Sequence, residues 1–216
     1  MRNTTIAFFL SVFVSVQAFS ADFQVKVTDP KGNPVKDAVV TLKPATPPTE
    51  IPAMEKVQIE QKNREFIPKV VVIQAGGEVE FPNHDSVQHH VYSFSKPKRF
   101  DLPLYKEATP KPVQFDTPGV VTLGCNIHDW MKAYIYVTDT PFYGKSGADG
   151  ILKISNVPSG SFQLVFWHPL FKKISGKALP ETLVFDEKNN VNESVSVELK
   201  REVAPPRHTG ESSGGY

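Results

Sequence analysis

The sequence predicts an all-β protein, and composition and pattern both support that class. Proline (19 residues) and phenylalanine (15) are abundant in the 216-residue chain, and short apolar runs alternate with proline- and glycine-rich turns. Long stretches with the 3.6-residue period of a helix are missing. The 24 lysines and arginines nearly balance the 23 acidic residues. This balance provides no basic stripe for nucleic acid and no attraction to an anionic membrane.

Segment 1–20 is typical of a signal peptide. Arg2 supplies a positive charge, residues 6–16 are almost purely apolar and serine, and small residues end the segment at Ser20. The apolar run is short for a membrane span, although an uncleaved anchor is the alternative. We expect export to the periplasm, cleavage after Ser20 or Ala21, and no membrane span in the mature protein.

Residues 22–44 predict two strands, 23–28 and 38–42, joined by turn residues at 29–34. Two strands alone do not form a stable domain. We therefore expect this segment to pair with a distant part of the chain. The proline-rich stretch that follows, residues 45–52, is typical of a linker.

Cys125 is the only cysteine in the chain. Exported proteins usually pair their cysteines in disulfides, so a lone one is an accident, an intermolecular bridge or a thiol protected by its role, for example as a metal ligand. Cys125 begins a Cys-x2-His-x2-Met pattern that continues to His128 and Met131. Apart from the initiator, the only other methionine is Met54.

A second cluster, at residues 81–91, supplies His84, His89 and His90. Two imidazoles, one thiolate and a weak axial thioether are the ligands of electron-transfer copper sites. Taken singly, each residue has an ordinary structural explanation, such as a methionine that fills the core. Their clustering within a few residues favours a metal site.

These segments resemble the plastocyanin/azurin family of cupredoxins. Residues 66–81 resemble the family's second and third strands, 81–91 its first-ligand strand and 119–125 the strand that leads to the copper loop. The short loop is most similar to that of amicyanin. The resemblance covers roughly residues 55–139 and implies a Greek-key cupredoxin β-sandwich at 45–139, with a closing strand at 133–137.

The resemblance also implies the ligands of one type 1 copper ion: His89, Cys125, His128 and Met131. The family usually has asparagine directly after the first histidine, where it ties the ligand strand to the copper loop by hydrogen bonds. Here that position is His90, which could preserve one such bond. Alternation along a strand sends His89 and His90 to opposite faces, so only one of them is expected to bind, and we favour His89.

In this family the loop histidine lies within an apolar surface patch. His128 would accordingly be the route for electrons, and Ile127 and Trp130 would help to form the docking surface for redox protein partners. Asn126 and its backbone N–H are candidates for hydrogen bonding to the thiolate, which tunes the potential of such sites.

The remaining strands are predicted at 149–154, 158–167 and 192–199. The turn motif at 29–35 and a later one at 149–162 resemble the carboxypeptidase regulatory-like (prealbumin-like) β-sandwich. Residues 22–44 with 140–200 would then form a second, Ig-like sandwich interrupted by the cupredoxin; unrelated flanking strands are the alternative. His168 is expected to be structural or to lie at the domain interface. Residues 201–216 are expected to be a disordered tail.

Three functions are compatible with these patterns. The first is a blue copper electron carrier, which is not an enzyme because protein ligands fill every position. The second is a module for copper storage or delivery, with His84 and His90 as extra ligands. The third is an open-site copper enzyme or sensor, in which Met131 does not coordinate. The ligand spacing favours the first, and the ligand set suits copper better than zinc.

Overall fold

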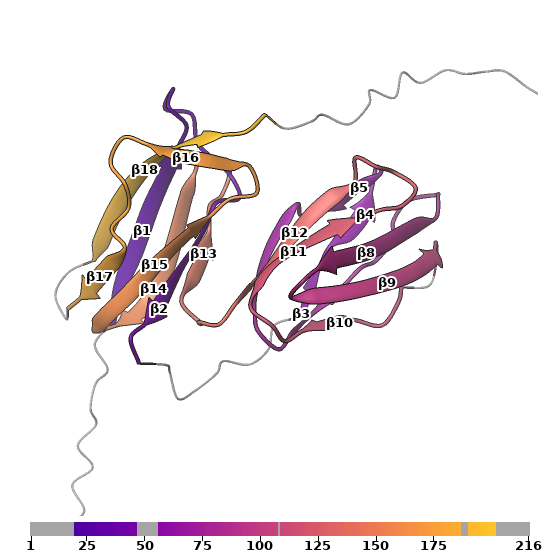
Figure 1. The fold of residues 1–216 in the computed structure, drawn as a ribbon, viewed down its shortest axis with the longest axis horizontal. Helices are drawn as coiled ribbons and strands as arrows, with labels where there is room; N and C mark the ends of the chain where they lie inside the picture. The colour runs from indigo at the N-terminus through magenta and orange to yellow at the C-terminus, as the bar shows by residue number, and fades with distance from the viewer. Residues whose placement is uncertain (1–19, 47–55, 108, 187–189, 202–216) are drawn as a thin grey trace, which may run out of the picture.

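The computed structural model describes residues 20–46, 56–107, 109–186 and 190–201. Every regular element in these ranges is a β-strand, which confirms the all-β class. The strands form two bodies that lie side by side (Figure 1). None of these residues belongs to a helix that is long and apolar enough to cross a membrane. The predicted leader (apart from Ser20), most of the linker and nearly all of the tail lie outside the described residues.

The first body, here called the outer sandwich, consists of two four-stranded sheets in the orders β14-β1-β18-β16 and β13-β2-β15-β17. Its strands are β1 (Ser20–Thr28), β2 (Val39–Pro44), β13 (Tyr143–Lys145), β14 (Ile151–Pro158), β15 (Gly160–Trp167), β16 (Phe171–Ser175), β17 (Thr182–Phe185) and β18 (Val191–Leu199).

Alternation places the apolar residues of β1 between these two sheets. There Phe23 and Phe162 each contact Phe185 edge to face. β1 pairs antiparallel with β14 and parallel with β18. The segment at 22–44 therefore pairs with distant strands, as expected. β1 begins at Ser20, the last residue of the predicted leader.

The turn after β1 is stabilised by its own first residue. The carboxylate of Asp29 accepts hydrogen bonds from the backbone N–H of Lys31 and Asn33, at 2.8 and 2.9 Å. An aspartate that bonds the backbone two residues later is a common turn device. The predicted turn is thus confirmed.

The second body, the inner sandwich, contains a five-stranded sheet (β6-β12-β11-β8-β9), a three-stranded sheet (β10-β7-β3) and a hairpin (β4-β5). Its strands are β3 (Lys56–Gln58), β4 (Glu60–Lys62), β5 (Glu65–Ile67), β6 (Val70–Gln74), β7 (Gly77–Glu80), β8 (His89–Ser95), β9 (Lys98–Tyr105), β10 (Val113–Phe115), β11 (Gly119–Gly124) and β12 (Lys132–Thr138). Its buried residues form a core separate from that of the outer sandwich.

Strand β11 lies in the middle of the five-stranded sheet. It pairs with β12 along its whole length and meets β8 where Gly124 lies opposite Tyr92. A Cβ atom at Gly124 would lie 2.8 Å from the Tyr92 ring. The tyrosine therefore rests directly on the backbone next to Cys125, and only glycine leaves room for it.

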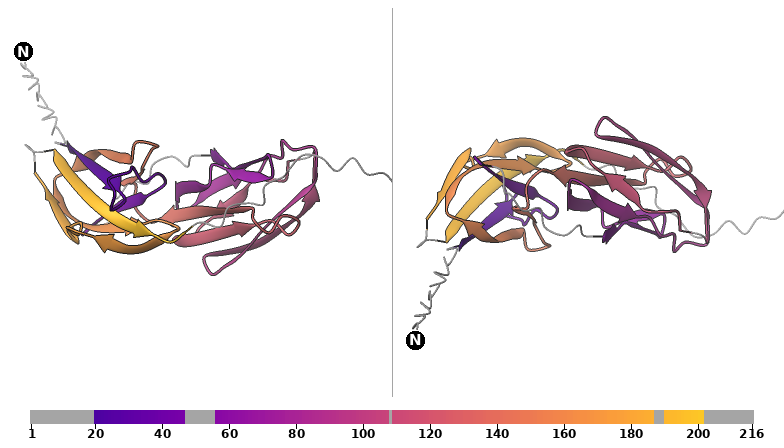
Figure 2. Two further views of the ribbon diagram at one scale, coloured as in Figure 1. Left: turned by 90° about the horizontal axis from the view of Figure 1, so that it is seen from above. Right: turned by 90° about the horizontal axis from the view of Figure 1, so that it is seen from below.

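The two sandwiches meet along β12, in the narrow middle of the elongated molecule (Figure 2). Trp167 at the end of β15 packs against Tyr134 and Tyr136, with ring centroids 5.9 and 5.5 Å apart. Lys145 donates a hydrogen bond to the Val70 carbonyl at 2.7 Å. Aromatic and polar contacts thus join the two bodies.

His168 lies beside this junction and has the structural role expected of it. Its Nε2 lies 3.1 Å from the Lys36 carbonyl, and its Nδ1 accepts a hydrogen bond from the Leu170 N–H. Burial lowers its pKa, so the ring is neutral at pH 7 and can act as donor on one side and acceptor on the other.

We expect Gly124→Ala to destabilise the protein by about 1–3 kcal/mol, because the added methyl group overlaps the Tyr92 ring. Urea unfolding of Gly124→Ala, Tyr92→Ala and the double variant measures the free energy of unfolding. Because Tyr92→Ala removes the overlap, adding Gly124→Ala to it should cost much less than Gly124→Ala costs in the parent protein. Equal losses with and without Tyr92 would contradict the contact.

Candidate metal centre

Two segments far apart in sequence bring three potential ligands together. His89 is the first residue of β8, Cys125 directly follows β11, and His128 lies three residues further along the loop. Their ligand atoms all lie within 4.8 Å of one another. Cys125 Sγ is 3.9 Å from the Nδ1 atom of each histidine. The two imidazoles thus face one thiol from different sides.

These distances fit a small transition-metal ion. Bonds of about 2.0 Å to nitrogen and about 2.3 Å to sulfur, as at zinc, would separate the two atoms by about 3.5–3.7 Å. The observed 3.9 Å is close to that separation. His89 is fully buried and Cys125 is 3% exposed, so the site is largely shielded from water. The donor set of imidazole and thiolate suits copper or zinc.

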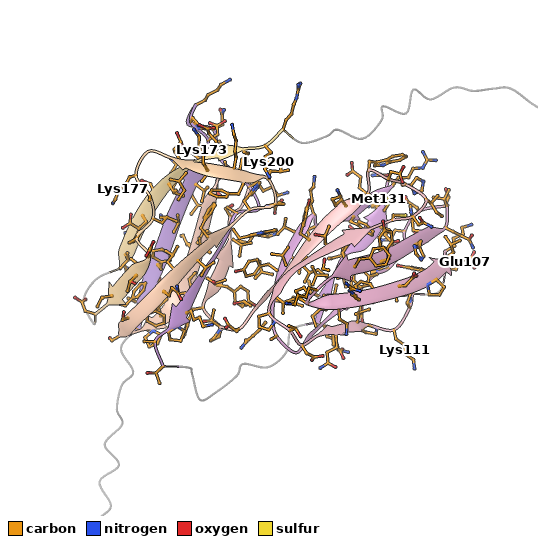
Figure 3. All side chains as sticks on the ribbon, viewed as in Figure 1. Glu107, Lys111, Met131, Lys173, Lys177 and Lys200 are labelled. Atoms are coloured by element: carbon orange, nitrogen blue, oxygen red, sulfur yellow. The ribbon has the colours of Figure 1, made fainter. Side chains whose placement is uncertain are left out.

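Met131 ends the loop that contains Cys125 and His128, at the upper end of the inner sandwich in Figure 3. Its side chain is 2% exposed and belongs to the same buried cluster as Cys125. Its backbone N–H donates to the His128 carbonyl at 2.9 Å, which closes the loop into a tight turn. The fourth predicted ligand therefore lies on the buried side of this loop.

Asp85 holds the other side of the His89 ring. Its Oδ2 lies 2.7 Å from His89 Nε2, so His89 Nδ1 is left facing Cys125. Metal-binding histidines characteristically donate their second N–H to a carboxylate in this way, which fixes the tautomer and the orientation of the ring. Partial burial tends to raise the pKa of Asp85, but hydrogen bonds from Arg64, His89 and Asn63 outweigh it and keep that pKa below its usual value.

A single hairpin turn connects both ligand-bearing segments. Asn63 and Arg64, between β4 and β5, have positive φ angles of 56° and 58°, as in a type I′ turn. Their backbone N–H groups donate to Asp85 at 2.7 and 2.9 Å. On its other side the Arg64 carbonyl accepts a hydrogen bond from Trp130 Nε1 at 3.2 Å. The turn thus supports His89 through Asp85 and the loop through Trp130.

Tyr105, at the end of β9, lies on the strand next to His89. It lies opposite His89 in the β8–β9 pair, and its hydroxyl donates to the Phe81 carbonyl at 2.6 Å. Burial raises the pKa of Tyr105 to about 12. The phenol is therefore a neutral donor at every physiological pH.

The other two histidines of the cluster point elsewhere. His84 Nδ1 lies 2.8 Å from Glu60 Oε2, and His90 Nε2 lies 2.5 Å from Asp101 Oδ1 on β9. His90 therefore does not form the bond to the copper loop that this position could have preserved. His90 alternates with the buried residues of β8, so its ring lies on the other face of the strand from the candidate ligand His89. Its Nδ1 is buried without a hydrogen-bond partner.

Sequence reasoning missed Asp85 and the Asn63–Arg64 turn as parts of the site. Asp85 lies four residues before His89, and a carboxylate this close to a predicted histidine ligand is the signal that could have identified it. Asn126, proposed as a hydrogen-bonding neighbour of the thiolate, is exposed in the structure.

No protein-family model matches this sequence, and no curated protein matches it. Among solved structures, the chain is similar to a copper-containing nitrite reductase (NirK) from Thermus scotoductus SA-01, with 25% identity and a TM-score of 0.37 over 44% of this chain and 25% of that one. It thus spans a quarter of the reductase chain.

Two cupredoxins are also similar. A purple cupredoxin from Nitrosopumilus maritimus has 23% identity and a TM-score of 0.34, over 38% of this chain and 99% of that one. Amicyanin from Paracoccus versutus has 20% identity and a TM-score of 0.36, over 46% of this chain and 97% of that one. Each of these likenesses covers less than half of the present chain.

We expect Asp85→Asn to weaken copper binding about 10- to 100-fold, because the amide no longer favours the His89 tautomer with a free Nδ1. Titration against a copper chelator of known affinity measures the change. Asp101→Asn is the matched control, since Asp101 bonds the neighbouring His90 instead. Equal losses in both variants would contradict the positioning role of Asp85.

Proposed function

We propose that this protein holds one type 1 copper ion and carries single electrons between redox partners. One observation carries the proposal: the buried Cys125 Sγ lies 3.9 Å from His89 Nδ1 and equally far from His128 Nδ1. A thiolate with two imidazoles is the in-plane ligand set of blue copper sites. His89, Cys125 and His128 would hold the ion, with Met131 as the weak axial ligand.

Bound copper would supply a one-electron couple, and the role of the chain is to keep the ligands in place in both oxidation states. Asp85 Oδ2 fixes the His89 ring through a contact of 2.7 Å with Nε2, on the side of the ring away from Cys125. Asp85 in turn accepts two backbone hydrogen bonds from the Asn63–Arg64 turn. Cys125 follows a strand paired on both sides. A site supported in this way on strands keeps its geometry better than one on a free loop.

The proposed role is electron transfer and not catalysis. With four protein ligands, no coordination position is left for a substrate, whereas catalytic metal sites keep one open. The depth of Met131, which is 2% exposed on the loop that supplies two other ligands, supports its inclusion as the fourth.

A first docking surface for redox partners is proposed around the loop. Ile127 is 49% exposed, and the ring centroids of His128 and Trp130 are 5.2 Å apart. An exposed apolar residue beside a half-buried ligand suits a small, transient interface. The signal-peptide pattern of residues 1–20 supports a periplasmic location for this exchange.

Storage or delivery of copper is the second function that the ligand set allows. That function would use His84 and His90 as extra ligands near the site. Their ring nitrogens instead contact Glu60 and Asp101, and neither histidine belongs to the group formed by His89, Cys125 and His128. The geometry therefore favours the carrier.

We expect the copper-loaded protein to show intense visible absorption from the thiolate–copper bond, and Cys125→Ser to abolish it and to weaken copper binding. Absorption spectra during titration with Cu(II) measure both effects. His84→Gln, which removes a histidine outside the group, should leave the colour unchanged. A coloured serine variant would exclude Cys125 as a ligand, and a colourless wild-type protein that binds copper would favour storage.

Met131→Gln should retain copper, shift the visible spectrum and lower the reduction potential, because the axial ligand tunes both. Spectra and voltammetry measure these changes. Met131→Leu keeps an apolar side chain at this buried position and should also alter the spectrum, because the thioether is lost. Unchanged spectra in both variants would show that Met131 only fills the core.

A further inference from the structure

The outward face of β8 carries a row of aromatic rings. Inward residues of this strand are buried, whereas His90, Tyr92 and Phe94 alternate outward. Ring centroids are 5.6 Å apart between His90 and Tyr92, and 5.0 Å apart between Tyr92 and Phe94. Phe94, at the far end of the row, is 72% exposed. The row therefore begins next to a predicted copper ligand and ends in solvent.

Another aromatic row on the five-stranded sheet is covered. Tyr134 and Tyr136 of β12 pack against Trp167 of the outer sandwich. Phe94, by contrast, shares with Val184 the greatest exposure of any large apolar side chain in the described part of the chain. In Figure 2 the β8–β9 hairpin extends away from the rest of the inner sandwich. An exposed phenylalanine on a projecting hairpin is typical of an interaction site.

The hairpin that carries Phe94 is positively charged. The hairpin from Phe94 to Phe100 contains Lys96, Lys98 and Arg99 and no acidic residue. Arg99 lies directly opposite Phe94 in the β8–β9 pair, where cross-strand side chains are in contact distance. The nearest acidic residue along β9, Asp101, is engaged by His90. Lys98 lies opposite Ser95 and so belongs to the inward face of the hairpin. The basic rim of Phe94 therefore consists of Arg99 beside it and the exposed Lys96 at the turn.

This hairpin is fastened to the sheet. Ser95 Oγ accepts a hydrogen bond from the Thr122 N–H at 2.9 Å. Pro97 lies against Gly119, whose φ of 137° and lack of a side chain allow the approach. The surface is therefore preformed, which reduces the entropy lost on binding.

Tyr92 connects this surface to the candidate metal centre. Its ring lies on Gly124, the residue bonded to Cys125. Phe94 is five residues from His89, or about 16 Å along an extended strand. The surface around Phe94 is therefore distinct from the one around Ile127, but it is linked to the centre by a continuous row of packed rings.

We propose that Phe94, with Arg99 beside it and Lys96 at the hairpin turn, forms a second docking surface, which binds an electron-transfer protein whose contact area is acidic around an apolar residue. The charge complementarity identifies this class of partner and would speed its association. The inference rests on the proposed electron-carrier function. It assigns two separate surfaces to the protein, one apolar around Ile127 and one basic around Phe94.

A binding experiment without copper tests the surface itself. The probe is a fluorescein-labelled peptide, Glu-Glu-Leu-Glu-Glu, whose anisotropy is followed at low ionic strength. Phe94→Ser and Lys96→Glu/Arg99→Glu should each weaken binding about tenfold. Lys26→Glu/Lys153→Glu is the matched control, because it makes the same charge change at exposed positions on the adjacent strands β1 and β14. An equal loss in the control, or none in Phe94→Ser, would overturn the proposal.

A rate experiment on the copper-loaded protein tests the function of the surface. Ferricyanide, an anionic one-electron acceptor, oxidises the reduced protein at a rate that stopped-flow absorption measures. Lys96→Glu/Arg99→Glu should slow this reaction about fivefold at low salt, with a smaller effect at high salt, and Lys26→Glu/Lys153→Glu should not. A rate sensitive only to Ile127→Glu would show that all exchange occurs at the loop and would overturn the proposal.

The visible spectrum separates failure of this inference from failure of the proposed function. All of these substitutions lie outside the candidate ligand group, so each variant should keep the spectrum of the parent. A coloured protein with no dependence on the hairpin would contradict only the second docking surface. A protein without the thiolate–copper band would contradict the electron-carrier function itself.

Discussion

The pairing of β11 on both sides is the constraint on which the candidate metal centre depends. Six residues of β11 pair with β12, and its last residue, Gly124, meets Tyr92 of β8. Cys125 therefore leaves the sheet beside the beginning of β8, where His89 lies. Two candidate ligands 36 residues apart in the chain meet because the hydrogen-bond ladder brings their strands together. The loop has only to turn back far enough to add His128, and the hydrogen bond from Met131 to His128 closes that turn.

Local patterns were sufficient to predict the all-β class, several strands and the residues that gather at the centre. These patterns could not predict contacts that distant segments make through their backbone groups. Asp85 binds the N–H groups of the Asn63–Arg64 turn, and Trp130 binds its carbonyl. Nearly every residue carries the same backbone N–H and carbonyl, so the residue type does not reveal which of these groups will bind a distant side chain. The prediction for His90 failed for a related reason: its partner Asp101 lies on β9, where Pro103 interrupts the alternation that would indicate a strand.

Aromatic rings on the outer face of the five-stranded sheet contribute both to the junction of the two sandwiches and to the proposed docking surface, but at the junction they are covered. The outward rings of β12 are covered by Trp167. Where the chain enters and leaves the inner sandwich, Thr140 Oγ1 donates to the Leu42 carbonyl at 2.7 Å, and Lys43 pairs with Asp139. The two segments that connect the sandwiches are thus bonded to each other. On the five-stranded sheet, the aromatic row of β12 thus faces the outer sandwich, whereas the row of β8 ends at the exposed Phe94.

The parallel pairing of β1 with β18 has a consequence for the order of folding. Phe23–Thr28 lie beside Val191–Ser196, so one sheet of the outer sandwich stays incomplete until nearly two hundred residues have been synthesised. The inner sandwich, whose core residues all lie between Ile59 and Val137, needs nothing from the later part of the chain for its own core. Contacts between residues close in sequence form faster than distant ones. The residues of the candidate metal centre can therefore assemble first, before the strand that completes the sheet of β1 is available.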